Sequence, residues 1–126
     1  MLKLPTLSEM DRAASVRIFL CTLPTDMRCG FDRLAERVRS SLGQDPLDGS
    51  LFVFRSRGSD RLKILYWDKD GYALWYKRLE QGTFRFPRIV PGAAAIEIKA
   101  SEMAMLLEGI DLKSIQRGPR WPMKNN

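Results

Sequence analysis

The chain has 126 residues, of which 44% are hydrophobic and 29% are charged, and its formal net charge is +6. These values are typical of one globular domain, and no apolar run approaches the roughly 20 residues that span a bilayer. The first residues lack the apolar stretch of a secretory signal. Histidine is absent, which excludes histidine-dependent nucleophilic triads and removes the usual general base near neutral pH. Most hydrolytic chemistry is therefore excluded, and we expect a cytoplasmic protein that uses no cofactor.

The basic residues are unevenly distributed. Fourteen of the 21 are arginine, and nine lie between Arg55 and Arg88 together with four acids, so this stretch carries five of the six net positive charges. Arginine binds phosphate through two parallel N–H groups, which favours a polyanionic partner. The two cysteines, Cys21 and Cys29, have the spacing of neither a zinc site nor a disulfide framework, so we expect reduced thiols.

The first half of the chain predicts one strand and one helix. Residues 1–15 show no firm period and are expected to form a loosely held arm, whereas the apolar run from Val16 to Leu20 predicts a buried strand. The helix is expected to begin near Thr25 or Asp26 as N-cap and to end before Gly43. Its apolar residues recur at helical spacing and form one stripe: Phe31, Leu34, Val38 and Leu42.

After a turn at residues 45–50 the apolar period changes to two. Four aromatic and β-branched runs follow, at residues 51–55, 61–68, 72–80 and 83–86. Short segments containing glycine separate these runs, which predicts antiparallel hairpins with glycine in the positive-φ positions. We expect the helix stripe to pack on this meander against Leu62, Ile64 and Leu74, because that pairing buries both apolar faces.

The last quarter predicts a short strand at Ile96 and Ile98, and a second helix from Ser101 that closes at Gly109. Residues 117–126 are expected to be a disordered basic tail. The predicted fold is α+β, in one domain over residues 1–116. It is a twisted antiparallel β-meander of four or five strands, with one helix packed across a face and a second, C-terminal helix.

Strand alternation predicts a sheet face that mixes tryptophan with basic side chains. Faces of this kind hold phosphates and stack bases in proteins that bind single-stranded nucleic acid. The alternative is a solvated face, on which tryptophan packs under the stems of lysine and arginine. The candidate nucleic-acid contacts are Arg55, Arg57, Arg61, Lys63, Trp67, Trp75, Lys77 and Arg78.

The segment from Thr25 to Gly30 joins the first strand to the helix. Its backbone N–H groups and Arg28 suit a phosphate at a helix N-terminus. The alternative, which we favour, is a structural role for Thr25, Asp26, Arg28 and Gly30, in which Thr25 or Asp26 caps the helix and Arg28 pairs with an acid in the sheet.

The aspartates invite a comparison with metal-dependent nucleases, which need clustered carboxylates. Three of the four fall in turns, where aspartate is common for local reasons, so we predict no catalytic or metal-binding residue. The four aspartates are Asp26, Asp60, Asp68 and Asp70.

Three segments carry a family resemblance: TDMRCG from Thr25, LFVFR from Leu51, and the long run from Asp60 to Pro87 that contains DRLKILYWD and GYALWYKRLE. In these segments the chain resembles TnpB, the accessory protein from the second reading frame of bacterial insertion sequence 66 elements. The likeness spans roughly residues 16–113, including MLLEGIDL from Met105. Two positions depart from the family pattern, since Cys29 replaces a basic residue and Phe86 replaces a tryptophan.

The resemblance implies a role in DNA transposition beside a separate, larger transposase, and it supplies no active site. We therefore expect a non-enzymatic accessory protein that binds DNA at the element ends through the basic aromatic face. The alternative is an interaction module that binds the transposase or its partner without contacting DNA. Salt dependence distinguishes the two, because binding that neutralises phosphates weakens steeply as salt rises.

Overall fold

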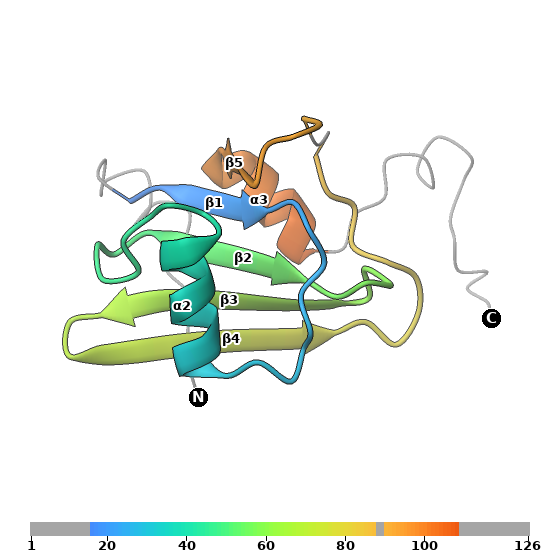
Figure 1. Ribbon diagram of the computed structural model, residues 1–126. Helices are drawn as coiled ribbons and strands as arrows, with labels where there is room; N and C mark the ends of the chain where they lie inside the picture. The colour runs from blue at the N-terminus through green and yellow to red at the C-terminus, as the bar shows by residue number, and fades with distance from the viewer. Residues whose placement is uncertain (1–15, 88–89, 109–126) are drawn as a thin grey trace.

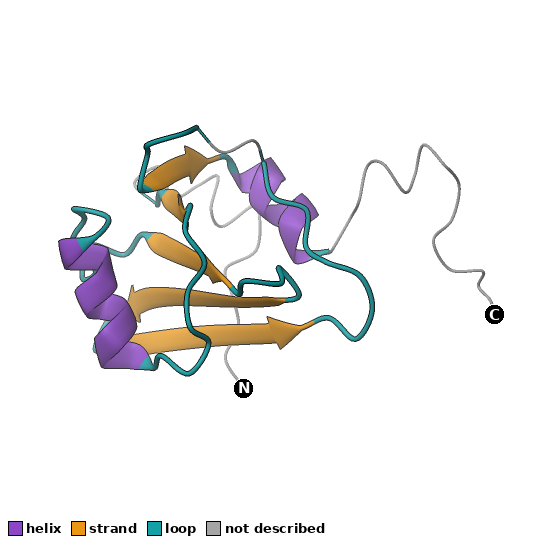
Figure 2. Cartoon of the chain, turned by 45° about the vertical axis from the view of Figure 1, so that its right-hand side comes forward, coloured by secondary structure: helices purple, strands orange, loops and turns teal. Residues whose placement is uncertain are grey.

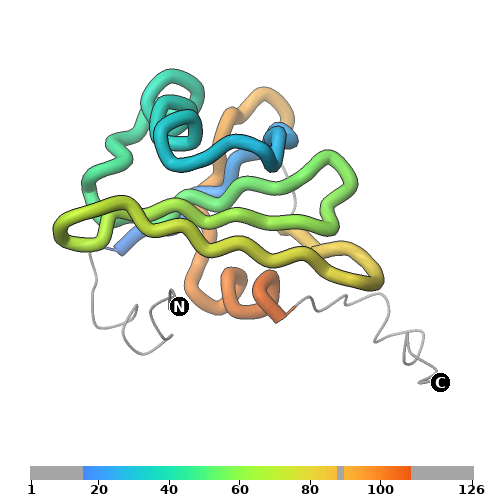
Figure 3. The backbone as a smooth tube through the Cα atoms, turned by 90° about the horizontal axis from the view of Figure 1, so that it is seen from below, coloured from blue at the N-terminus to red at the C-terminus, as the bar shows by residue number. Residues whose placement is uncertain are grey.

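Alternating side chains give the central sheet two apolar faces, and one helix covers each face (Figures 1 and 3). The computed structural model describes residues 16–87 and 90–108. The expected arm at 1–15, the helix stop at Gly109 and the tail at 117–126 lie outside the described residues. The strands are β1 (Ile18–Cys21), β2 (Leu51–Arg55), β3 (Arg61–Asp68), β4 (Gly71–Arg78) and β5 (Ala95–Ile98), and the helices are α2 (Phe31–Ser40) and α3 (Ala100–Leu107).

The predicted α+β class is confirmed, with one correction to the sheet. Strands β2, β3 and β4 form the expected antiparallel meander. Strand β1, however, pairs in parallel with β2 and antiparallel with β5, which gives the order β4-β3-β2-β1-β5. The sheet is therefore mixed. A parallel pair needs a crossover connection, and α2 supplies it because this helix lies between β1 and β2 in the chain.

The predicted strand at residues 83–86 is absent from the described structure. The chain turns at Gly82, whose φ is 76°, and then crosses the end of the β2–β3 hairpin. There Leu79 N donates to Asp60 O at 2.8 Å and Phe84 N donates to Ser59 O at 2.7 Å. Phe84 is buried in the core rather than paired with β4, so β4 forms one edge of the sheet.

The helix α2 covers one face of the sheet, and two of the three residues predicted to face it lie on the other face. Its buried Leu34 and Val38 lie with Phe52 and Leu65. Leu62 and Ile64 belong instead to the second cluster, with Met103 and Leu106 of α3. Figure 2 shows α3 well apart from α2. The prediction was correct for Leu74, which packs on the α2 side. It was wrong for Phe31, whose side chain is 47% exposed at the start of the helix.

Two local details also differ from expectation. The N-cap of α2 is Gly30, so neither Thr25 nor Asp26 caps this helix. In the two hairpin turns the positive-φ residues are Ser59 and Lys69 rather than the neighbouring glycines. Gly43 does follow α2 with a φ of 65°, as the sequence predicts. Neither described helix has the length and apolar character needed to cross a membrane.

Candidate nucleic-acid interface

The loop between β1 and α2 is fixed to the sheet by hydrogen bonds with residues of β2 and β3. Thr25 N donates to Arg55 O at 2.8 Å. The Lys63 amine donates to Met27 O at 2.6 Å and to Cys29 O at 2.8 Å. Arg55 Nη2 donates to Thr22 O at 2.8 Å. The loop therefore has a defined shape where it crosses the α2 side of the sheet.

Two of the predicted phosphate contacts, Lys63 and Arg55, hold the loop against the sheet. Lys63 is only 7% exposed, and its amine lies 4.7 Å from the centre of the Tyr76 ring. The half-buried Arg55 guanidinium lies 5.7 Å from the centre of the Phe86 ring. Because both cations donate to loop carbonyls, we assign them to holding the loop rather than to the surface that a ligand meets.

The expectation that Trp67 and Trp75 share one face is wrong. The β3–β4 turn pairs Trp67 with Tyr72 and Ile64 with Trp75. An odd-numbered residue in β3 therefore shares a face with an even-numbered residue in β4. Trp67 lies on the α2 side, edge-on to Tyr72 with ring centres 5.1 Å apart. Trp75 packs against the other core, under α3.

Lys77 also lies on the α3 side of the sheet. Its amine donates to Leu107 O at 3.2 Å, at the last residue of α3. A cation at this position stabilises the carbonyl end of the helix. Lys77 is therefore separated by the sheet from Arg61 and Lys63, with which it was expected to act.

The remaining arginines of the predicted set gather at one end of the sheet. Arg57 and Arg61 are exposed on the β2–β3 hairpin, and Arg78 is exposed at the end of β4. Arg61 and Arg78 stand directly opposite each other across the two strands. Like charges in this arrangement repel. Glu80 offsets part of this charge through a contact of 3.1 Å with Arg78 Nη2.

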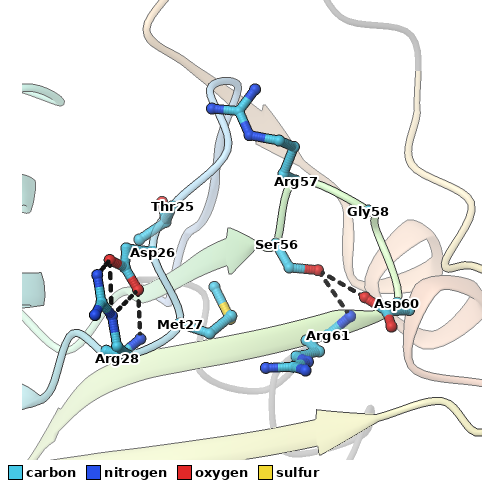
Figure 4. A pocket seen from close by; sticks show the side chains of 9 residues that line it. All are labelled: Thr25, Asp26, Met27, Arg28, Ser56, Arg57, Gly58, Asp60 and Arg61. Atoms are coloured by element: carbon cyan, nitrogen blue, oxygen red, sulfur yellow. Dashed lines mark hydrogen bonds and ion pairs between the residues drawn. The ribbon is translucent and has the colours of Figure 1, made fainter.

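Arg28, which we had assigned to structure, lies at the same end of the molecule. The loop and the hairpin enclose an open groove of about 450 Å³. Figure 4 shows Arg28 on the loop side of this groove, with Arg57 and Arg61 on the hairpin side. Its lining residues are Thr25, Asp26, Met27, Arg28, Ser56, Arg57, Gly58, Asp60 and Arg61. Sequence spacing alone cannot show that these two segments meet.

Asp26 and Arg28 form an ion pair inside the loop, not a contact with an acid of the sheet. Arg28 donates from Nε to both carboxylate oxygens at 3.1 Å and from Nη2 to Oδ2 at 2.7 Å. Its backbone N donates to Oδ1 at 2.9 Å. These hydrogen bonds hold the pKa of Asp26 at about 2, below its ordinary value of 3.8. The pair is exposed, with 92% of the Arg28 side chain open to solvent.

The aspartates lie at opposite ends of the sheet. Asp26 and Asp60 border the groove, and Asp60 Oδ1 accepts a hydrogen bond of 3.1 Å from the Ser56 hydroxyl. Asp68 and Asp70 lie at the β3–β4 turn, the far end of an eight-residue strand. Within residues 16–87 and 90–108, no three His, Cys, Asp or Glu side chains form a group that could hold a metal ion.

Comparison with known proteins identifies the family. The family model described as IS66 Orf2 like protein matches residues 16–117. Two relatives come from Sinorhizobium fredii (strain NBRC 101917 / NGR234). The uncharacterized protein y4hO is 45% identical over 102 residues, which cover 81% of this chain and 87% of the relative. The uncharacterized protein y4jC is 39% identical over 104 residues, covering 82% and 87%.

No solved structure matches the chain. The family match covers all the described strands and helices, together with the groove and the arginines around it. The predicted resemblance is thus confirmed, and the chain belongs to the IS66 Orf2-like family, a family of accessory proteins of insertion-sequence transposition.

Proposed function

We propose that this accessory protein binds the DNA of the element ends through the arginine-rich end of its sheet and catalyses no reaction itself. The observation that carries the proposal is the convergence of exposed arginines from three segments: Arg28 from the β1–α2 loop, Arg57 and Arg61 from the β2–β3 hairpin, and Arg78 from β4. DNA phosphates would neutralise the repulsion between these guanidinium groups.

The charge distribution supports a phosphate ligand over an apolar one. Arg57 and Arg61 form no ion pair with any described residue. The predicted tryptophan face cannot serve as one stacking platform, because Trp67 and Trp75 lie on opposite sides of the sheet. We therefore place the emphasis on phosphate contacts and on duplex DNA, in which the bases are already stacked.

The test is fluorescence anisotropy of a labelled duplex carrying the element end, measured with the full chain between 50 and 200 mM salt. Four phosphate contacts predict a slope of log K against log salt of about −3 to −4. Arg57→Gln should reduce the magnitude of that slope by about 0.9, because one fewer counterion is released.

Lys69→Gln is the matched control. It removes the same single charge at the β3–β4 turn, about 25 Å away along an eight-residue strand, and should leave the slope unchanged. Equal effects of the two substitutions would show only a response to net charge and would contradict the proposed surface. Absence of DNA binding at low salt, together with capture of the transposase, would instead favour a protein-interaction module.

A further inference from the structure

The groove beside Arg28 has a geometry suited to one particular group of the DNA, an inference that rests on the proposed function. The guanidinium of Arg28 has two edges that can grip an oxyanion, one formed by Nε and Nη2 and the other by the two Nη atoms. Asp26 occupies only the first edge. The second edge remains available, and its N–H groups have no acceptor among the described residues.

A buried hydroxyl borders the same groove without a partner. Thr25 lines the groove and is 4% exposed, and its Oγ1 forms no hydrogen bond in the described part of the chain. An unpaired buried hydroxyl is unfavourable unless a ligand or a water supplies the missing hydrogen bond. Because this oxygen is closed to solvent, it marks an unsatisfied position beside the groove rather than a contact that a ligand already reaches.

The charge of the groove matches a singly charged anion. Three arginines and two aspartates line it, so its formal charge is +1. Asp60 and Asp26 already accept hydrogen bonds from Ser56 and Arg28, which satisfies part of each carboxylate. A phosphodiester carries one negative charge, whereas a terminal phosphate carries close to two at neutral pH.

We propose that this groove is a binding site for one backbone phosphodiester, held by Arg28, Arg57 and Arg61. The loop and the hairpin supply the guanidinium groups from two sides. Because Lys63 and Arg55 fix the loop to the sheet, the backbone on the loop side of the groove is in place before the ligand arrives. The three guanidinium groups point in different directions (Figure 4), so these exposed side chains turn toward the phosphate when it binds.

The first test titrates dimethyl phosphate, a minimal phosphodiester, into the ¹⁵N-labelled full chain, with sodium chloride at matched ionic strength as the reference. Saturable shifts are expected for the amides of residues 25–28 and 56–61. Arg28→Lys keeps the charge but loses the planar fork, and should weaken binding by about threefold or more. Lys69→Gln should stay within about twofold of the wild type, since a distant exposed charge adds little.

Amide chemical-shift changes that sodium chloride reproduces, or that are spread evenly over the surface, would overturn the proposed site.

A second experiment compares the affinities of duplexes with and without 5′-phosphates by anisotropy, and equal affinities are expected. Binding that requires the terminal phosphate would overturn the assignment to the backbone. If Arg28→Lys still binds DNA, and dimethyl phosphate causes no chemical-shift changes around the groove, the phosphodiester site is rejected but the proposed DNA-binding function stands. Groove shifts with dimethyl phosphate but no DNA binding would reject that function and keep the site.

Discussion

The amine of Lys63 illustrates how a buried cation shapes this protein at the scale of single residues. It lies among Met27 O, Cys29 O and the Tyr76 ring, so main-chain dipoles and an aromatic face take the place of water. Its position fixes the loop that carries Asp26 and Arg28. The shape of the candidate site thus depends on a residue that does not line the groove.

Replacing Lys63 tests that role. Lys63→Met keeps the aliphatic stem but leaves two carbonyl oxygens without their donor, so we expect a loss of about 1–3 kcal/mol in the free energy of unfolding. Urea denaturation followed by circular dichroism measures the change. Lys69→Met, at an exposed turn position, should stay within about ±0.5 kcal/mol. Equal losses for the two variants would contradict the internal role of Lys63.

The Asp26–Arg28 pair predicts a low titration midpoint. The folded-state pKa of Asp26, about 2, lies below its ordinary value of 3.8. The contribution of the pair is therefore fully present above pH 3.8 and is lost as pH falls through about 2. Carboxyl carbon shifts in a pH titration should give that midpoint for Asp26. In Arg28→Ala the midpoint should rise, since the side-chain donors are removed while the backbone N–H of residue 28 still donates to Asp26; an unchanged midpoint would exclude the Arg28 side chain as the cause.

At the scale of elements, the helix α2 was predictable but the face it covers was not. Its stripe is visible because Leu34 and Val38 recur at helical spacing. The strand β3 gives no matching clue, because its five consecutive residues from Leu62 to Tyr66 are all buried. When both faces of a strand are apolar, alternation identifies the strand but not the helix that each face receives.

Double-mutant cycles measure which face α2 occupies. Leu34→Ala should cost about 2–5 kcal/mol, because the side chain is fully buried. Combined with Leu65→Ala, which lies in the same cluster, it should show a coupling of about 0.5 kcal/mol or more. Combined with Leu62→Ala, which lies on the α3 side, it should be additive within about 0.5 kcal/mol. Coupling of Leu34 with Leu62 but not with Leu65 would instead support the sequence-based prediction, in which α2 packs on the face that carries Leu62.

At the scale of the whole molecule, sheet order and the groove depend on contacts between distant segments. The meander was predictable because short turns join its strands. The parallel β1–β2 pair was not, because its partners are separated by the whole of α2. Likewise, Arg57 and Arg61 were candidates from local charge, but their meeting with Arg28 depends on the path of the loop across the sheet.

The strand order predicts a gradient of hydrogen-exchange protection. Strand β2 is the central strand of the five, with an inner strand on each side and a helix-covered core on each face, so its amides should exchange most slowly. Strand β4 forms an edge of the sheet, so its outward-facing amides should exchange much faster. Amide exchange followed by NMR distinguishes these strands. Uniform protection of β4 would indicate that another chain covers this edge.

The position of β1 between β2 and β5 has a consequence for synthesis of the protein. The ribosome delivers β1 first, but its partner β5 and the helix α3 are among the last described segments to emerge. The α2 side of the sheet can close as soon as β4 is made. Until residues 95–107 follow, the nascent chain exposes Ile18, Leu62 and Ile64 beside an unpaired strand edge. That interval is when a second nascent copy can add to the sheet, and when a chaperone has the most apolar surface to protect.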